Sequence, residues 1–145
     1  MEETKESGFT FLEMILVLAV LSIMTAIILP IGDRWIRTTA EEDALQMFIA
    51  SVYDMQAHSM ANSVRTKLNF KYSGTEYSTS ESTGKVIARN IFPQGMRFDS
   101  SSTLKEMEIL ANGNLVKFGT LTFSTSSGLI ELRVQLQRGR MIIYE

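Results

Sequence analysis

The sequence predicts an α+β fold in which a long N-terminal helix packs on a C-terminal antiparallel β-sheet. Three observations predict this fold. Residues 14–31 contain no charged side chain and are long enough to cross the hydrocarbon core of a membrane as a helix. Apolar side chains then recur at helical spacing up to about Asn62. After Asn62 the apolar period changes from about 3.6 to 2, which is the period of a strand.

The composition suits one membrane anchor and one modest domain, because 145 residues leave little room for a second core. The formal net charge of -2 lies in residues 1–8, which hold three of the 16 acidic residues and one of the 14 basic ones. The remaining 13 of each sign cancel, and a neutral chain argues against strong nonspecific attraction to nucleic acid. Cysteine is absent, which excludes a disulfide framework and a thiol nucleophile.

We interpret residues 1–8 as a short polar leader. A conventional secretory signal has a basic start, a shorter apolar core and a small-residue cleavage site after it, a pattern that this chain does not show. Glu13 stands just inside the apolar run, where a carboxylate costs about 2 to 3 kcal/mol to insert unless something offsets it. From the residues alone two interpretations stay open: a functional intramembrane acid, or an acid at the headgroup level of an ordinary anchor.

Residues 8–13, with the sequence GFTFLE, and the apolar run after them resemble the prepilin signature of type IV pilins and pseudopilins. The resemblance implies that a membrane peptidase cuts between Gly8 and Phe9 and methylates the new amine of Phe9. A glycine suits this cut, because without a side chain it lets an enzyme approach the backbone closely. The resemblance also implies that Glu13 is the assembly residue, which meets the terminal amine of a neighbouring subunit.

Residues 9–31 are then expected to form the transmembrane helix. The resemblance implies a single-pass protein of the cell membrane, with its N-terminus in the cytoplasm and its head outside, that later joins a filament at the cell surface. Arg34 and Arg37 follow the span while Lys5 precedes it, so the positive-inside rule mildly favours the opposite orientation. The implied partners are other pilins of the same filament, the prepilin peptidase and methyltransferase, an assembly-platform membrane protein and membrane lipid.

Pro30 leaves two possibilities for the next segment. A proline removes one backbone hydrogen bond from a helix, so the membrane helix could end there. Pilins, however, often carry a proline near this position within a helix that bends and continues, and we therefore expect a helix kink at Pro30. We assign residues 32–62 to an amphipathic helix.

Two overlapping capping boxes, Thr38 to Glu41 and Thr39 to Glu42, suit the start of this helix. Its apolar stripe is expected to pack on the sheet rather than to bind a cofactor. The stripe comprises Leu45, Phe48, Ile49 and Val52, then Gln56 or Ser59, with Met55 and Met60 near its edge.

Residues 63–145 are expected to form a β-rich head built from hairpins. Residues 64–71 alternate apolar and polar side chains as a half-buried strand does. Asn112-Gly113 is a strong hairpin signal between the strand candidates 107–111 and 115–118. Residues 78–84 and 99–103 are expected to be polar loops, and residues 96–98 are ambiguous. The other strand candidates are residues 75–79, 85–92, 119–124, 130–137 and 141–144.

Catalysis finds little support in the sequence. His58, the single histidine, lies one turn after Asp54 on the amphipathic helix. As an acid–base pair the two would need a nucleophile or a substrate pocket that nothing nearby supplies, so we expect a solvated or interface histidine. No phosphate loop, paired carboxylates or metal-ligand cluster occurs in the sequence. We expect no enzyme, no catalytic residue, no metal and no cofactor.

The chain carries a basic segment between Val64 and Phe98, with six basic residues and two acidic ones. Three explanations stay open: a solvated strand face, pairing with the acidic helix of an adjacent subunit, or contact with DNA phosphates. We select Arg65, Lys67 and Lys71 as the candidate interface or DNA-contact residues.

These expectations combine into a minor pilin-like subunit. In its short acidic leader, small head and late hairpins the chain resembles competence minor pilins of the ComGD type, which belong to the filament that takes up DNA in Gram-positive bacteria. We therefore expect a subunit of a competence apparatus needed for DNA binding and uptake in transformation. One alternative is a GspH-like minor pseudopilin of a type II protein secretion system. Another is a single-pass anchored binding domain that never polymerises.

Overall fold

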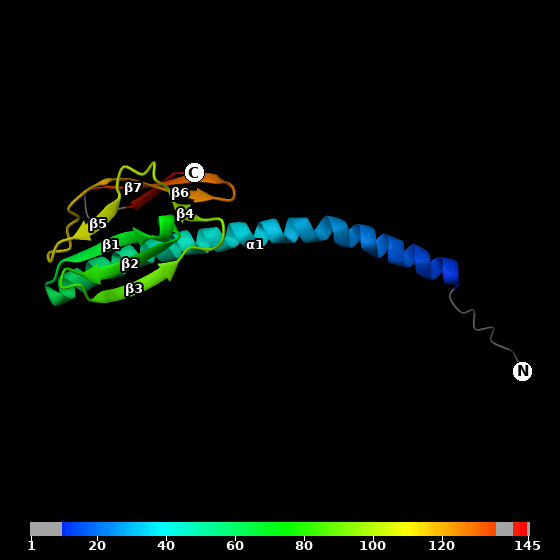
Figure 1. Ribbon diagram of the computed structural model, residues 1–145, viewed down its shortest axis with the longest axis horizontal. Helices are drawn as coiled ribbons and strands as arrows, with labels where there is room; N and C mark the ends of the chain where they lie inside the picture. The colour runs from blue at the N-terminus through cyan, green and yellow to red at the C-terminus, as the bar shows by residue number, and fades with distance from the viewer. Residues whose placement is uncertain (1–9, 136–140, 145) are drawn as a thin grey trace, which may run out of the picture. The chain divides into compact units, whose positions relative to one another are not determined.

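The computed structural model describes residues 10–135 and 141–144, with backbone alone for residues 29–34 and 141–144 (Figure 1). The chain divides into two compact units, Met1–Ile36 and Arg37–Glu145. The fold is the expected α+β fold, with one N-terminal helix followed by antiparallel strands.

The helix α1 (Phe11–Asn62) is a single run of 52 residues. It ends at Asn62, as predicted, and Pro30 lies in its interior, so the alternative in which the membrane helix stops at Pro30 is wrong. The kink at Pro30 stays a prediction. The two capping boxes are also wrong, since Thr38 and Thr39 stand inside a continuing helix whose backbone N–H groups need no side-chain cap.

The strands of the head form two four-stranded antiparallel sheets in place of the single sheet that we expected. The first sheet has the order β3-β2-β1-β5 and the second has the order β4-β6-β7-β8. The elements are β1 (Thr66–Lys71), the short 3-10 turn η1 (Tyr72–Gly74), β2 (Glu76–Glu81), β3 (Val86–Ile91), β4 (Arg97–Phe98), β5 (Glu106–Ile109), β6 (Gly119–Thr125), β7 (Gly128–Val134) and β8 (Met141–Tyr144).

The segment that follows β5 does not form the hairpin strand that the sequence predicts. The Asn112-Gly113 turn forms, with Gly113 at φ 81° and its N–H bonded to the carbonyl of Leu110. However, the segment after the turn makes a single bridge, Ile109 to Leu115, with a backbone hydrogen bond from the Val116 N–H to the Glu108 carbonyl, while β5 pairs along its length with β1 through its other edge. The expected strand at 115–118 is therefore absent from the described head, and the chain moves on to β6 in the other sheet.

The polar stretch 78–84 also differs from the expected loop. Ser78 and Thr79 belong to β2 and are only 4% and 2% exposed. β2 lies between β1 and β3, so its backbone is paired on both sides and its small side chains are covered by neighbours. The loop is confined to the turn between β2 and β3, and the ambiguous residues 96–98 contain β4, which pairs with β6.

The core of the head lies between the C-terminal part of α1 and the strands (Figure 1). Phe48 is fully buried and meets the rings of Tyr77 and Phe123 edge to face at centroid distances of 5.1 and 5.2 Å. The predicted stripe is confirmed, with Leu45, Phe48, Val52 and Ser59 buried and Ile49 packed against them. Met55 is also buried although we placed it at the edge of the stripe.

Candidate functional site

The start of α1 is capped by Thr10. The Thr10 Oγ1 accepts a hydrogen bond from the backbone N–H of Glu13 at 3.3 Å, and the Thr10 carbonyl accepts one from the N–H of Met14 at 3.2 Å. Thr10 is therefore the N-cap residue and Glu13 stands three positions later, the spacing of a capping box. A carboxylate in the first turn also faces the positive end of the helix dipole. The Thr-x-x-Glu spacing could have revealed this cap in the sequence.

The first 18 residues of α1, Phe11–Ile28, are long and apolar enough to cross a membrane, with a mean hydropathy of 2.6. None of this stretch is buried within the protein. Its hydroxyl groups are satisfied inside the helix, because Ser22 Oγ donates to the Leu18 carbonyl at 2.8 Å and Thr25 Oγ1 donates to the Leu21 carbonyl at 2.7 Å. The stretch thus presents few unsatisfied polar groups to an apolar surrounding.

Gly8 and Phe9, the predicted cleavage and methylation residues, lie outside the described residues. Glu13 is described and exposed in the first turn of α1. The roles of all three residues stay predictions.

The structure pairs three of the six basic residues of this segment with acids. Arg65 lies 3.2 Å from Glu108, and Arg89 lies 2.8 Å from Glu76. Lys85 is 4.0 Å from Glu81. Glu108 belongs to β5 and lies outside residues 64–98, in which we counted the charges. Its pairing with Arg65 makes the net positive charge around this segment smaller in the folded head than the count along the sequence indicates.

The three selected basic residues are not brought together as one site. Arg65 is turned toward Glu108, and Lys67 is half-buried as the second residue of β1. Lys71 stands exposed at the end of β1, where it lines an open groove with residues that the sequence analysis did not select.

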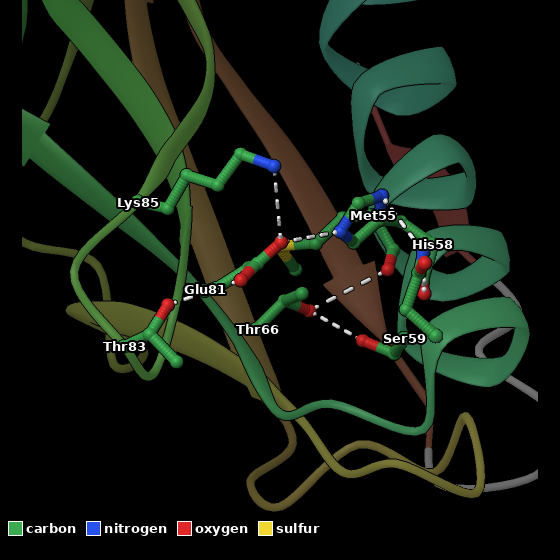
Figure 2. Close-up of polar contacts among 8 residues, drawn as sticks. Met55, His58, Ser59, Thr66, Glu81, Thr83 and Lys85 are labelled. Atoms are coloured by element: carbon green, nitrogen blue, oxygen red, sulfur yellow. Dashed lines mark hydrogen bonds and ion pairs between the residues drawn. The ribbon is translucent and has the colours of Figure 1, made fainter.

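His58 joins the last turns of α1 to the end of β2 (Figure 2). His58 Nε2 lies 3.0 Å from Glu81 Oε1, and since an ionised carboxylate can only accept, Nε2 donates. Nδ1 then accepts from the amide of Asn62 at 3.3 Å, so the network is complete with a neutral imidazole. Hydrogen bonds from His58 and from Thr83 hold the pKa of Glu81 below its usual value.

The His58 side chain is 27% exposed, and its described hydrogen bonds go to Glu81 and Asn62 rather than to Asp54 in an acid–base pair. The expected role of His58 at an interface stays a prediction. Beside His58, Ser59 Oγ and Thr66 Oγ1 share a buried hydrogen bond of 2.6 Å (Figure 2). The cluster ties the helix to the sheet. Among the residues that the structure describes, no group of three or more His, Cys, Asp or Glu side chains could hold a metal ion.

Glu41 makes a second link between α1 and the sheets. Its carboxylate is only 3% exposed and accepts two hydrogen bonds of 2.8 Å, from the backbone N–H and from the hydroxyl of Ser126 in the turn between β6 and β7. The sequence analysis placed Glu41 at a helix start, whereas the folded chain uses it to hold this turn against the helix.

A family described as the prokaryotic N-terminal methylation motif matches residues 4–29. The chain therefore carries this motif, and its fold is that of type IV pilins. Both the motif and the fold agree with the expectation of a pilin-like chain.

Two solved structures illustrate the likeness. The minor pseudopilin EpsH from the type 2 secretion system of Vibrio cholerae is 10% identical, with 72% of this chain and 96% of that chain covered and a TM-score of 0.57. The type IV minor pilin FimU of Pseudomonas aeruginosa is 17% identical, with 80% and 93% covered and a TM-score of 0.56. No curated protein sequence matches the chain significantly. At these identities the likeness establishes the fold.

Proposed function

We propose that this chain is a minor pilin-like subunit of a type IV pilus-related filament, with a structural role. The observation that carries the proposal is the methylation motif that leads directly into an apolar helix of a chain with a pilin-like fold. The helix holds the subunit in the membrane before assembly and packs among neighbouring helices in the filament afterwards. One helix can serve both surroundings, because the hydroxyls of Ser22 and Thr25 are satisfied within it.

Glu13 fits the role of assembly residue through its position in the cap. It stands in the first turn, next to the unpaired N–H groups and the positive end of the helix dipole. Cleavage after Gly8 would put a terminal amine two residues from the start of α1, which adds a positive charge near that end. Both effects lower the cost of holding the carboxylate in lipid and leave it available to the amine of a neighbouring subunit.

The finer assignment that we propose is the competence apparatus, in which the filament serves DNA binding and uptake in transformation. Its support is the resemblance to competence minor pilins. The partners are then the other pilins of that filament, the prepilin peptidase and the assembly platform, with the head outside the membrane. A second candidate, a GspH-like minor pseudopilin of a type II secretion system, is supported by the structural likeness to EpsH, which is a minor pseudopilin of such a system.

Processing tests the class of protein. Co-expression with the prepilin peptidase is expected to shorten the chain by its first eight residues and to leave a methylated Phe9, as measured by mass spectrometry of the N-terminus. Retention of Met1 in the presence of the active peptidase contradicts the proposal and favours the non-polymerising anchor.

Substitution of Glu13 tests the assembly role. Glu13→Ala is expected to leave membrane insertion intact and to reduce incorporation into sheared filaments, because the variant loses the charge that meets the neighbouring amine. Glu131→Ala removes an exposed acid of the head and serves as the control. Equal incorporation of the two variants argues against the role. A deletion strain separates the two machines, since competence predicts lost transformation with normal secretion, and the second candidate predicts the reverse.

A further inference from the structure

An open groove of about 600 Å³ lies on the head where η1 meets β4. Its lining comes from three segments of the chain: the end of β1 with η1, β4 with the loop after it, and Lys105 just before β5. Phe70 and Phe98 join the first two segments, because their rings stack at a centroid distance of 3.7 Å with 7° between their planes. The groove is therefore built by the tertiary fold and belongs wholly to the head.

The groove gathers positive charge. Lys71, Arg97 and Lys105 line it with exposed side chains, against one lining carboxylate, that of Asp99. Asp99 keeps its negative charge while its carboxylate accepts a hydrogen bond of 2.8 Å from the backbone N–H of Ser101, and Lys105 Nζ donates a hydrogen bond to the Ser100 carbonyl. The lining thus has three positive side chains against one negative. The local excess of cations contrasts with the ion pairs that Arg65, Lys85 and Arg89 make and with the neutral balance of residues 9–145. Such a concentration of cations attracts a chain of phosphates.

An aromatic ring stands among these cations. Tyr72 follows Lys71 directly and is 69% exposed, although a ring of this size gains about 1.5 to 3 kcal/mol from burial. Among the described contacts of the head, none engages its hydroxyl, and most of the side chain meets solvent. An exposed aromatic ring beside a row of cations is the arrangement that binds single-stranded nucleic acid, in which bases stack on the ring and phosphates meet the cations.

The backbone holds Tyr72 in this place under strain. Tyr72, Ser73 and Gly74 have φ values of 50°, 56° and 87°, all in the left-handed region, which costs non-glycine residues of order 1 kcal/mol or more each. The turn is fixed by Gly74, which packs so closely that a Cβ there would lie 2.3 Å from the Phe98 carbonyl oxygen. Strain of this kind persists where the surrounding structure over-determines it, and it gathers at ligand-binding sites.

We infer that this groove binds single-stranded nucleic acid, with a base stacked on Tyr72 and the phosphates held by Lys71, Arg97 and Lys105. The inference rests on the proposed function, which exposes the head to nucleic acid outside the cell. Duplex DNA fits less well, because its bases are stacked on one another and offer no free face to the ring. An acidic protein segment would use the cations and leave the ring without a partner.

The test is binding of a fluorescent oligo(dT) of about 16 nucleotides to the full-length protein in detergent micelles, followed by anisotropy across a series of salt concentrations. For the parent we expect a slope of about -2 when the logarithm of the binding constant is plotted against the logarithm of the salt concentration. The variant Lys71→Gln/Arg97→Gln/Lys105→Gln is expected to weaken binding at least about ten-fold at low salt and to bring this slope closer to zero. The matched control, Arg65→Gln/Lys85→Gln/Lys117→Gln, removes the same charge from exposed residues outside the groove and is expected to change binding little.

Substitution of the ring separates stacking from simple charge attraction. Tyr72→Ala is expected to weaken binding about five-fold or more, whereas Tyr72→Phe keeps the ring and is expected to bind as the parent does. The expected competitor pattern is that single-stranded DNA displaces the probe better than duplex DNA or poly-glutamate. The inference is overturned by absent binding at low salt, by equal losses in the groove and control variants, or by displacement that poly-glutamate achieves as well as DNA.

Measurements of filament assembly and transformation in cells distinguish this inference from the proposed function. The groove variant is expected to enter filaments normally and to lower transformation. Normal transformation with normal filaments overturns the inference and leaves the filament role standing. Filaments that form without this subunit, together with normal transformation of the deletion strain, overturn the competence function itself.

Discussion

The strained turn that precedes β2 offers a sharp test of how the head is packed. Gly74 and Gly84 both have positive φ, 87° and 92°, so an alanine at either position meets a similar backbone cost of about 1 to 2 kcal/mol. The two sites differ in the space available to an added Cβ atom. A Cβ at Gly74 would lie 2.3 Å from the Phe98 carbonyl oxygen and 3.1 Å from the Phe98 Cβ, whereas a Cβ at Gly84 would have no heavy atom within 4 Å.

The contact at Gly74 cannot be relieved by a side-chain rotation, because its nearest atom belongs to the backbone of β4. We therefore expect Gly84→Ala to cost about 1 kcal/mol, since the smaller entropy of its unfolded chain offsets part of the backbone term. Gly74→Ala is expected to cost about 1 to 3 kcal/mol more, the usual range for forcing an atom into packed space.

Urea unfolding of the full-length protein in detergent, followed by circular dichroism of the sheets, measures this difference in free energy of unfolding. Gly74→Ala is also expected to weaken oligonucleotide binding, because a shift of Phe98 moves one wall of the groove. Free energies of unfolding that agree within about 0.5 kcal/mol for the two variants would refute the reasoning, since only the shared backbone cost would then be acting.

Three further predictions concern the contacts between α1 and the sheets. Phe48→Ala is expected to cost about 3 to 5 kcal/mol in urea unfolding, because it empties the centre of the aromatic cluster, whereas Met47→Ala, which is 57% exposed in the parent, should cost less than about 1 kcal/mol. Glu41→Ala is expected to cost about 1 to 3 kcal/mol, because both donors of the β6–β7 turn lose their acceptor, while the exposed Glu42→Ala should stay near the parent. Glu81 has a lowered pKa in the folded state, so its contribution to stability is present above its unfolded pKa and is lost as the pH falls through the folded value. Unfolding midpoints of Glu81→Gln are thus expected to converge with those of the parent in acid, and a constant difference at all pH values would contradict this role.

The long helix, with its apolar first part and the buried stripe of its last part, could be predicted from local patterns. The apolar run, the end at Asn62 and the stripe through Leu45, Phe48 and Val52 depend on side-chain spacing along one helix, and spacing is a property of the sequence itself. The methylation motif is equally local, since it consists of a short run of adjacent residues. Local turn signals likewise indicated Asn112-Gly113, although they could not indicate which strand would pair with β5.

Long-range pairing was decided by the tertiary structure. Pairing of β5 with β1 brings Glu108 to Arg65, which removes one of the selected basic residues from the surface charge. Packing of η1 on β4 brings Lys71 together with Arg97 and Lys105 in one groove, although these residues are far apart in the sequence. A one-dimensional count of charges cannot indicate which of them will be neutralised, because an ion pair depends on distances of a few ångströms that are set when strands from separate segments dock.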